Sequence, residues 1–119
     1  MEDHDVFSFT LLPQAPTQHP SIPAPFQIPK LNNHNLFEIA VDELQHLLSS
    51  RALTSEEYTQ FCLDRVQAIN PYLECVIETN PDALTIARGL DAERREGVVR
   101  GPLHGIPVLI KDVCVQYRP

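Results

Sequence analysis

The sequence predicts an α/β fold in which helices flank a mixed sheet. Apolar residues recur at helical spacing in three segments, and each segment is bounded by helix start and stop signals. A short run rich in β-branched residues, 73–78, lies between the second and third segments. A continuous apolar run, 108–110, follows the third segment, and such runs are typical of strands that are buried on both faces. The predicted order is therefore helix, helix, strand, helix, strand.

The first 35 residues are predicted to lie outside this fold. Six of the eleven prolines fall between Pro13 and Pro29. Proline removes a backbone donor and fixes φ, which disfavours both a helix and a central strand there. We therefore expect a disordered, partly polyproline II leader over residues 1–35 and a partial domain over residues 36–119. A proline-rich ligand for an SH3-like groove is the alternative interpretation, and the absence of a flanking basic cluster speaks against it.

Two helices are predicted directly after the leader. Asn35 is expected to cap the first, with Glu38 as its reciprocal partner. Its apolar stripe consists of Phe37, Ala40, Val41, Leu44, Leu47 and Leu48. Thr54 and Glu57 form a capping box for the second helix, which should end before Pro71 because proline disfavours the helical conformation of its predecessor. Two helices with so short a connection are expected to pack as an antiparallel hairpin.

The third helix follows the first predicted strand. Asn80 is expected to cap it, with Pro81 at the first helical position. Gly97 is the expected residue just beyond its end, where a left-handed conformation is common. Gly101 and Gly105 then mark tight turns before the second predicted strand.

The composition excludes several classes of protein. The 119 residues are 43% hydrophobic and 21% charged, as is typical of soluble globular chains, and the net charge of −7 does not support a basic surface for nucleic acid or anionic lipid. No apolar run is long enough to span a membrane or to act as a secretory signal, so a cytoplasmic location is expected. The three cysteines are odd in number and lack a C-x-x-C pair, which predicts reduced, mostly buried thiols and no zinc site. No cofactor or metal is expected.

Five stretches of the chain carry a resemblance to a known family. They are residues 43–45 (ELQ), 53–55 (LTS), 78–84 (ETNPDAL), 90–94 (LDAER) and 100–112 (RGPLHGIPVLIKD). The last stretch contains the specific string G-P-L-H-G-I-P-x-x-x-K-D. Together these residues resemble the N-terminal part of the amidase signature family over residues 36–112. The resemblance implies a hydrolase that cleaves small-molecule carboxylic amides with a serine–serine–lysine triad.

The resemblance makes Lys111 the catalytic base. Burial at the end of an apolar strand disfavours the charged ammonium form, so the amine can draw a proton through a bridging serine from the nucleophilic serine. Lys30, in the predicted leader, is the only other lysine. We expect His104 to hold the preceding turn through a backbone hydrogen bond, and Asp112 to orient or solvate the region around the lysine.

The resemblance also implies residues that this sequence does not supply. The family places its two triad serines in a glycine- and serine-rich segment well beyond the lysine strand, but only eight residues follow Lys111 here, and the last seven of them, 113–119, diverge from the family pattern. The serines present are Ser8, Ser21, Ser49, Ser50 and Ser55. None of them lies in a glycine-rich turn. We therefore expect the N-terminal part of an amidase, truncated after the lysine strand and inactive alone.

Two alternatives remain open at this point. The chain is either a truncated or misread gene product, or a non-catalytic helical interaction module that forms homo-oligomers or pairs with a full-length homologue. In every case we expect a marginally stable helical hairpin with poorly ordered strands, because the sheet neighbours of the predicted strands are missing.

Overall fold

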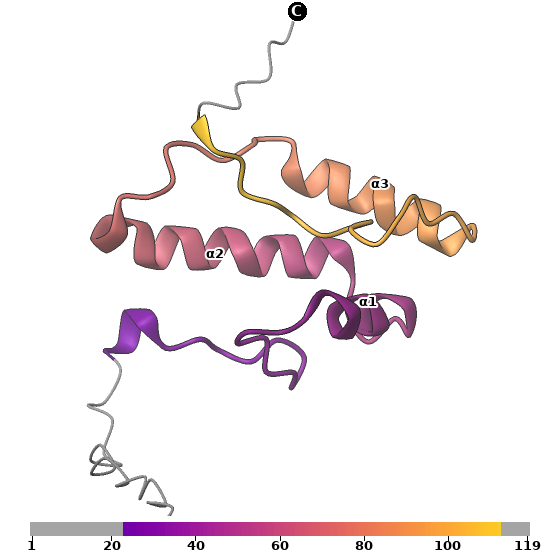
Figure 1. Cartoon of the computed structure of the whole chain (residues 1–119), viewed down its shortest axis with the longest axis horizontal. Helices are drawn as coiled ribbons and strands as arrows, with labels where there is room; N and C mark the ends of the chain where they lie inside the picture. Colours follow the sequence, from indigo (N-terminus) through magenta and orange to yellow (C-terminus); the bar gives the residue numbers. More distant parts are fainter. Residues whose placement is uncertain (1–22, 113–119) are drawn as a thin grey trace, which may run out of the picture.

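The computed structural model describes residues 23–112, and helices dominate this range. The helices are α1 (Val41–Ser49), α2 (Ser55–Leu73) and α3 (Ala83–Arg95), preceded by one turn of 3-10 helix, η1 (Ala24–Phe26). α2 runs through the middle of the molecule, with α3 on one side and with α1 and residues 23–40 on the other (Figure 1). The three predicted helices are therefore confirmed, although their ends differ from the prediction.

The two predicted strands are wrong for the described residues, 23–112. The only paired extended residues in this range are Leu31 and His34, which form an isolated bridge. Leu73 ends α2, and residues 74–78 form a loop in which Ile77 is 82% exposed; the segment 108–110 is also exposed and unpaired. A strand needs a hydrogen-bonded neighbour, and nothing within residues 23–112 supplies one. The sheet of the predicted α/β class is consequently not seen.

The start of α1 differs from the prediction because the side chain of Asn35 stabilises a turn instead of capping the helix. α1 begins at Val41, after an extended N-cap residue that makes no side-chain cap bond. The Oδ1 atom of Asn35 instead accepts a hydrogen bond from the amide of Phe37 (3.1 Å), and Glu38 has a left-handed φ of 52°. An asparagine that bonds to the backbone two residues ahead stabilises a turn and competes with a helix.

The predictions for the two ends of α2 differ in accuracy. The capping box is confirmed, because Thr54 Oγ1 accepts from the amide of Glu57 (3.1 Å) and the Glu57 carboxylate accepts from the amide of Thr54 (2.9 Å). The predicted end before Pro71 is wrong, since α2 continues to Leu73. Pro71 lies in the last turn, so the helix runs only two residues beyond it, and the single helix bond that proline removes is the one to the carbonyl of Gln67. Asn70 then binds the departing chain, accepting hydrogen bonds from the amides of residues 75 and 76.

α3 also starts later than predicted and ends as predicted. Asn80 and Pro81 form a turn ahead of the helix, because the Asn80 side chain accepts a hydrogen bond from the amide of Asp82 (2.9 Å). α3 therefore begins at Ala83. At the other end, Gly97 has a φ of 85°, and the backbone bonds around it form a Schellman motif.

The predicted antiparallel hairpin of the first two helices is wrong. Among the described elements, α2 packs most extensively on α3, which runs antiparallel to it, whereas α1 is seen nearly end-on beside the start of α2 (Figure 1). The connection between α1 and α2 explains the crossing. Arg51 has a left-handed φ of 61°, and Leu53 is buried, so the chain turns sharply before α2 begins.

The hydrophobic core lies at this crossing. Leu44, Leu48 and Leu53 are each at most 3% exposed and form its centre. Partly buried residues packed against them are Leu31, Ile39, Leu47, Tyr58 and Ile106. The core thus joins α1, the start of α2 and the loop after α3. Within residues 23–112, no helix has the length and apolar character needed to cross a membrane.

Replacement of Leu48 tests whether this small core supports the fold. We expect Leu48→Ala to lower the free energy of unfolding by about 2–4 kcal/mol, because it leaves a cavity in the centre of the core. Leu109→Ala is the matched control, since Leu109 is 79% exposed, and it should change that free energy by less than about 0.5 kcal/mol. Urea unfolding followed by far-UV circular dichroism measures both. Equal effects of the two substitutions would contradict the assignment of the core.

Candidate functional site

Lys111, the predicted base, lies at the end of the exposed apolar segment 108–110. Its side chain is exposed and makes no hydrogen bond or ion pair with the residues that the structure describes. The same exposure applies to Asp112, whose orienting role stays a prediction. The position of this segment is set by the loop that precedes it, residues 100–106, which we call the anchor loop. The candidate site is therefore built from the contacts that hold the anchor loop.

His104 is the buried centre of the anchor loop. Its side chain is only 5% exposed, and both ring nitrogens meet backbone groups. Nδ1 accepts a hydrogen bond from the amide of Arg100 (3.2 Å), so the ring hydrogen lies on Nε2, which donates to the carbonyl of Leu90 (2.9 Å). These bonds tie the loop to α3. The prediction that His104 holds the turn through a backbone hydrogen bond is confirmed.

Two polar side chains from two helices hold the carbonyls of the anchor loop. Gln45 of α1 donates from Nε2 to the carbonyls of Pro102 (2.8 Å) and His104 (3.0 Å). Arg94 of α3 donates to the same carbonyl of His104 (3.0 Å) and to Oε1 of Gln45 (2.9 Å). Arg94 also reaches Oγ of Ser49 at the end of α1 (3.2 Å). α1, α3 and the anchor loop are thus connected through one hydrogen-bond network.

Gly105 allows the anchor loop to approach α2 closely. It is buried, and its φ of 81° lies in the left-handed region. A Cβ atom at this position would lie 2.1 Å from Oγ of Ser55, the first residue of α2. Ser55 is itself fully buried, and its hydroxyl has no hydrogen-bond partner among the described residues. Both the backbone conformation and the available space therefore require glycine at position 105.

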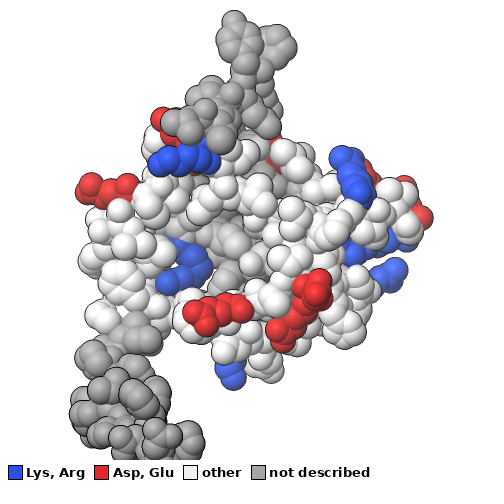
Figure 2. Space-filling model, in the orientation of Figure 1, with Lys and Arg blue, Asp and Glu red and all other residues white. Residues whose placement is uncertain are grey.

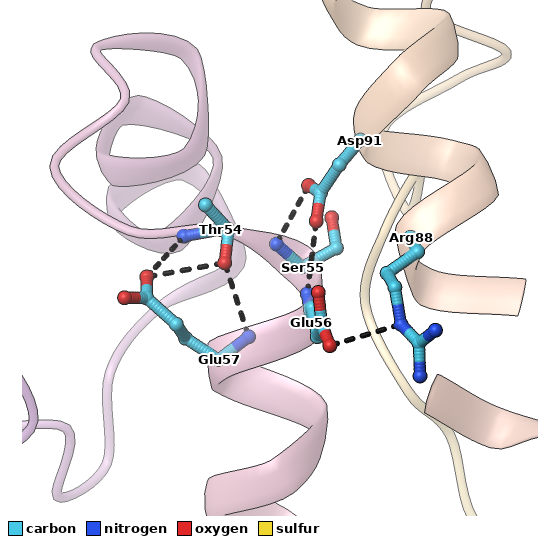
Figure 3. Close-up of polar contacts among 6 residues, drawn as sticks. All are labelled: Thr54, Ser55, Glu56, Glu57, Arg88 and Asp91. Carbon is cyan, nitrogen blue, oxygen red and sulfur yellow. Dashed lines mark hydrogen bonds and ion pairs between the residues drawn. The ribbon is translucent and has the colours of Figure 1, made fainter. Parts of the chain in front are cut away.

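Asp91 of α3 caps the N-terminus of α2 (Figure 3). Its Oδ1 accepts from the amide of Ser55 (2.8 Å) and its Oδ2 accepts from the amide of Glu56 (3.0 Å). The capping box satisfies the next amide, so the first turn of α2 has its free donors paired. Arg88 adds an exposed ion pair with Glu56 (2.9 Å). The negative carboxylate of Asp91 also suits the positive end of the helix dipole.

An ion pair links the end of α3 to the start of the anchor loop. Arg100 binds the Glu93 carboxylate through two guanidinium nitrogens. The hydrogen bond from Arg100 lowers the pKa of Glu93, and the same bond raises the pKa of Arg100. On the face shown in Figure 2, acidic and basic side chains are interspersed, and neither sign forms a continuous patch.

The cysteines differ in their surroundings. Burial is the main cause that raises the pKa of Tyr58 to about 12 and the pKa of the neighbouring Cys62 thiol, so this pair stays protonated at neutral pH. Cys75 is exposed, which corrects the expectation of mostly buried thiols, and Cys114 lies outside the described residues. Between residues 23 and 112, no group of three or more His, Cys, Asp or Glu side chains is placed to hold a metal ion.

The contacts that hold the anchor loop and cap α2 could not be read directly from the sequence. Gln45, Asp91 and Arg94 lie in stretches that carry the family resemblance, but their partners are far away in the sequence. Spacing rules report only neighbours on one helix or strand. The one signal that could have pointed to them was the clustering of these residue types within the resembling stretches.

Comparison with known proteins places these features in a family context. A family model described as Amidase matches residues 57–116, from the first turn of α2 to beyond Lys111. A "putative amidase" of Schizosaccharomyces pombe is 45% identical over 87 residues, which cover 73% of this chain and 15% of the relative. A "probable amidase" of Arabidopsis thaliana is 35% identical over 94 residues, which cover 77% of this chain and 18% of the relative.

A bacterial relative gives a similar result. The "putative amidase AmiD" of Mycobacterium tuberculosis is 34% identical over 87 residues, which cover 72% of this chain and 18% of the relative. The chain thus spans only 15–18% of the length of these three relatives. No solved structure matches it.

Substitution of Gly105 tests the close approach of the anchor loop to α2. We expect Gly105→Ala to lower the free energy of unfolding by about 2–4 kcal/mol, because the methyl group meets Ser55 and the backbone is left-handed. Gly101→Ala is the matched control, because nothing lies within 4 Å of the position that its methyl group would take, and it should stay within about 0.5 kcal/mol of wild type. Urea unfolding measures both. An unchanged free energy of unfolding in Gly105→Ala would show that the loop does not dock on Ser55.

Substitution of Asp91 tests the cap of α2. We expect Asp91→Ala to lower the free energy of unfolding by about 2 kcal/mol, because two helix amides lose a charged acceptor. Asp64→Ala is the control, since the side chain of Asp64 accepts an exposed hydrogen bond from its helix neighbour Gln60. Hydrogen exchange at the amides of Ser55 and Glu56 should accelerate in Asp91→Ala alone. Unchanged exchange there would refute the cap.

Proposed function

The chain belongs to the amidase family, and on this premise we propose that it is the N-terminal part of an enzyme that hydrolyses carboxylic amides. One observation carries the proposal. The family match includes both the anchor loop and Lys111, and two of the residues that hold the loop, Arg94 and His104, lie in the same matched segment. The substrate class that this implies is a small-molecule amide.

Lys111 is proposed as the base of a serine–serine–lysine triad. Its neutral amine would accept a proton from a bridging serine, which in turn takes the proton of the nucleophilic serine as that oxygen attacks the amide carbonyl. A neutral amine requires apolar surroundings, and Val108, Leu109 and Ile110 supply only part of them while they remain exposed. We propose that other segments of the complete enzyme cover this apolar run.

The described serines support the structure of the chain. Ser50 donates to the carbonyl of Leu47 (3.1 Å), Ser49 accepts from Arg94, and Ser55 is buried under Gly105. We propose that both triad serines lie outside the residues described, and that this chain alone turns over no amide. A panel of simple amides offered to the purified chain should therefore give no hydrolysis. Hydrolysis that Lys111→Ala abolishes would contradict this part of the proposal.

A chimaera tests the role of Lys111 directly. The matched residues of this chain would replace the corresponding segment of the S. pombe relative, and amide hydrolysis would be measured. We expect the chimaera to be active and Lys111→Ala to lower kcat by about 10²–10⁴-fold, the usual contribution of a general base. Lys111→Arg should fail equally, because arginine stays protonated.

The control for the chimaera is Arg95→Ala, which removes an exposed basic side chain within the matched residues 57–116 and should leave kcat unchanged. Activity of Lys111→Ala within twofold of the parent would refute the assignment of the base. An inactive parent chimaera that is folded would count against the placement of this chain at the N-terminus of an amidase.

A second candidate function is a non-catalytic helical module that pairs with a full-length homologue. The observation that favours it is that α1, the start of α2 and the anchor loop share a core of their own while the segment before Lys111 stays exposed. Co-purification of the chain with a full-length relative, lost on Leu109→Asp, would support this role. Failure to bind would remove it.

A further inference from the structure

Residues 23–34 lie along the side of α2 that faces away from α3 (Figure 1). The sequence pattern assigns them to the leader, and the boundary at residue 35 stays a prediction, while residues 1–22 lie outside the described part. In the structure, η1 lies toward the C-terminal end of α2 and Leu31 lies near its start, so this segment runs antiparallel to the helix.

The end of this segment next to Leu31 is firmly fixed. Leu31 packs on the core formed by Leu44, Leu48 and Leu53. The backbones of Leu31 and His34 exchange two hydrogen bonds (3.1 and 2.8 Å) around Asn32 and Asn33, which have φ values of 49° and 66°. Two successive left-handed residues between such bonds form a type I′ turn, for which asparagine is well suited. This turn gives the segment a defined hinge.

The other end is held by one guanidinium group. Arg65 of α2 donates from one terminal nitrogen to the carbonyl of Gln27 (2.9 Å) and from the other to the carbonyl of Pro25 (3.0 Å). The planar fork of arginine suits two acceptors at once. Beside it, the ring of Phe26 lies against the ring of Tyr72, with centroids 5.4 Å apart and the planes tilted by 56°.

Little apolar burial supports this second end. Phe26 and Ile28 are each more than a third exposed, and Lys30 is exposed as well. A hollow of about 360 Å³ remains beside α2 where the segment passes over it. Its lining consists of Leu31, Glu56, Glu57, Gln60, Phe61 and Asp64. Regions with few buried contacts open at low free-energy cost, so the two ends should differ in how readily they detach.

We propose that residues 23–30 form a latch on α2, hinged at the Asn32–Asn33 turn and held closed by Arg65. Opening the latch uncovers the Arg65 guanidinium and the face of the Tyr72 ring that Phe26 contacts. The latch does not depend on amidase activity, so the experiment that tests it is independent of the experiments that test the proposed function.

The rate of trypsin cleavage after Lys30 measures how readily the latch opens in the intact chain. Proteolysis requires the latch to leave α2, so cleavage should be at least about tenfold slower in the folded chain than in a synthetic peptide of residues 23–37. Arg65→Ala should accelerate cleavage after Lys30 by about tenfold, since two hydrogen bonds are lost. Arg65→Lys should give an intermediate rate, because an ammonium group lacks the planar fork.

Arg95→Ala is the matched control, because Arg95 is exposed on α3 and should leave the rate unchanged. Phe26→Ala is a second variant that alters the latch without altering α2, and it should also accelerate cleavage. Far-UV circular dichroism confirms that each variant keeps its helices. The proposal is overturned if the chain and the peptide are cleaved equally fast, or if neither Arg65→Ala nor Phe26→Ala changes the rate by more than twofold.

Discussion

The fold depends on the contact between the Asp91 carboxylate and the first turn of α2. Its two oxygens accept hydrogen bonds from the amides of Ser55 and Glu56. These bonds fix α3 relative to α2. The side chain of Ser55 faces Gly105, so the same residue that α3 binds through its amide also forms the surface on which the anchor loop rests. A change at this point therefore affects two helices and the loop together.

The polar network around the anchor loop explains how a small core can hold a chain with so much exposed apolar surface. Only a few leucines and Ala87 are buried hydrophobic residues in the described part. Gln45, Arg94 and His104 supply additional links between elements, each through hydrogen bonds to backbone carbonyls or amides. Since such bonds are directional, they position the loop more sharply than apolar contact alone would do.

Local rules predicted the features that depend on neighbouring residues. The capping box at Thr54 and the left-handed Gly97 were readable because each involves a short-range pattern, whereas the turn-holding role of His104 was expected from the family resemblance. Asn35 and Asn80 misled the prediction of helix starts because an asparagine side chain stabilises a turn as readily as a helix. The strands, the contacts of Asp91 and the packing of α2 on α3 rest on partners distant in sequence, and no local pattern reports them.

The anchored loop also has a consequence for how a neighbouring strand could add to residues 107–111. Ordering a backbone costs about 1–2 kcal/mol of conformational entropy per residue. In the anchor loop that ordering has already taken place, because Gln45, Arg94 and the His104 ring restrain it at several points. Residues 107–111, which follow the loop, therefore start from a fixed position and leave it in a fixed direction. Such preorganisation lowers the entropic cost of assembling a sheet around them.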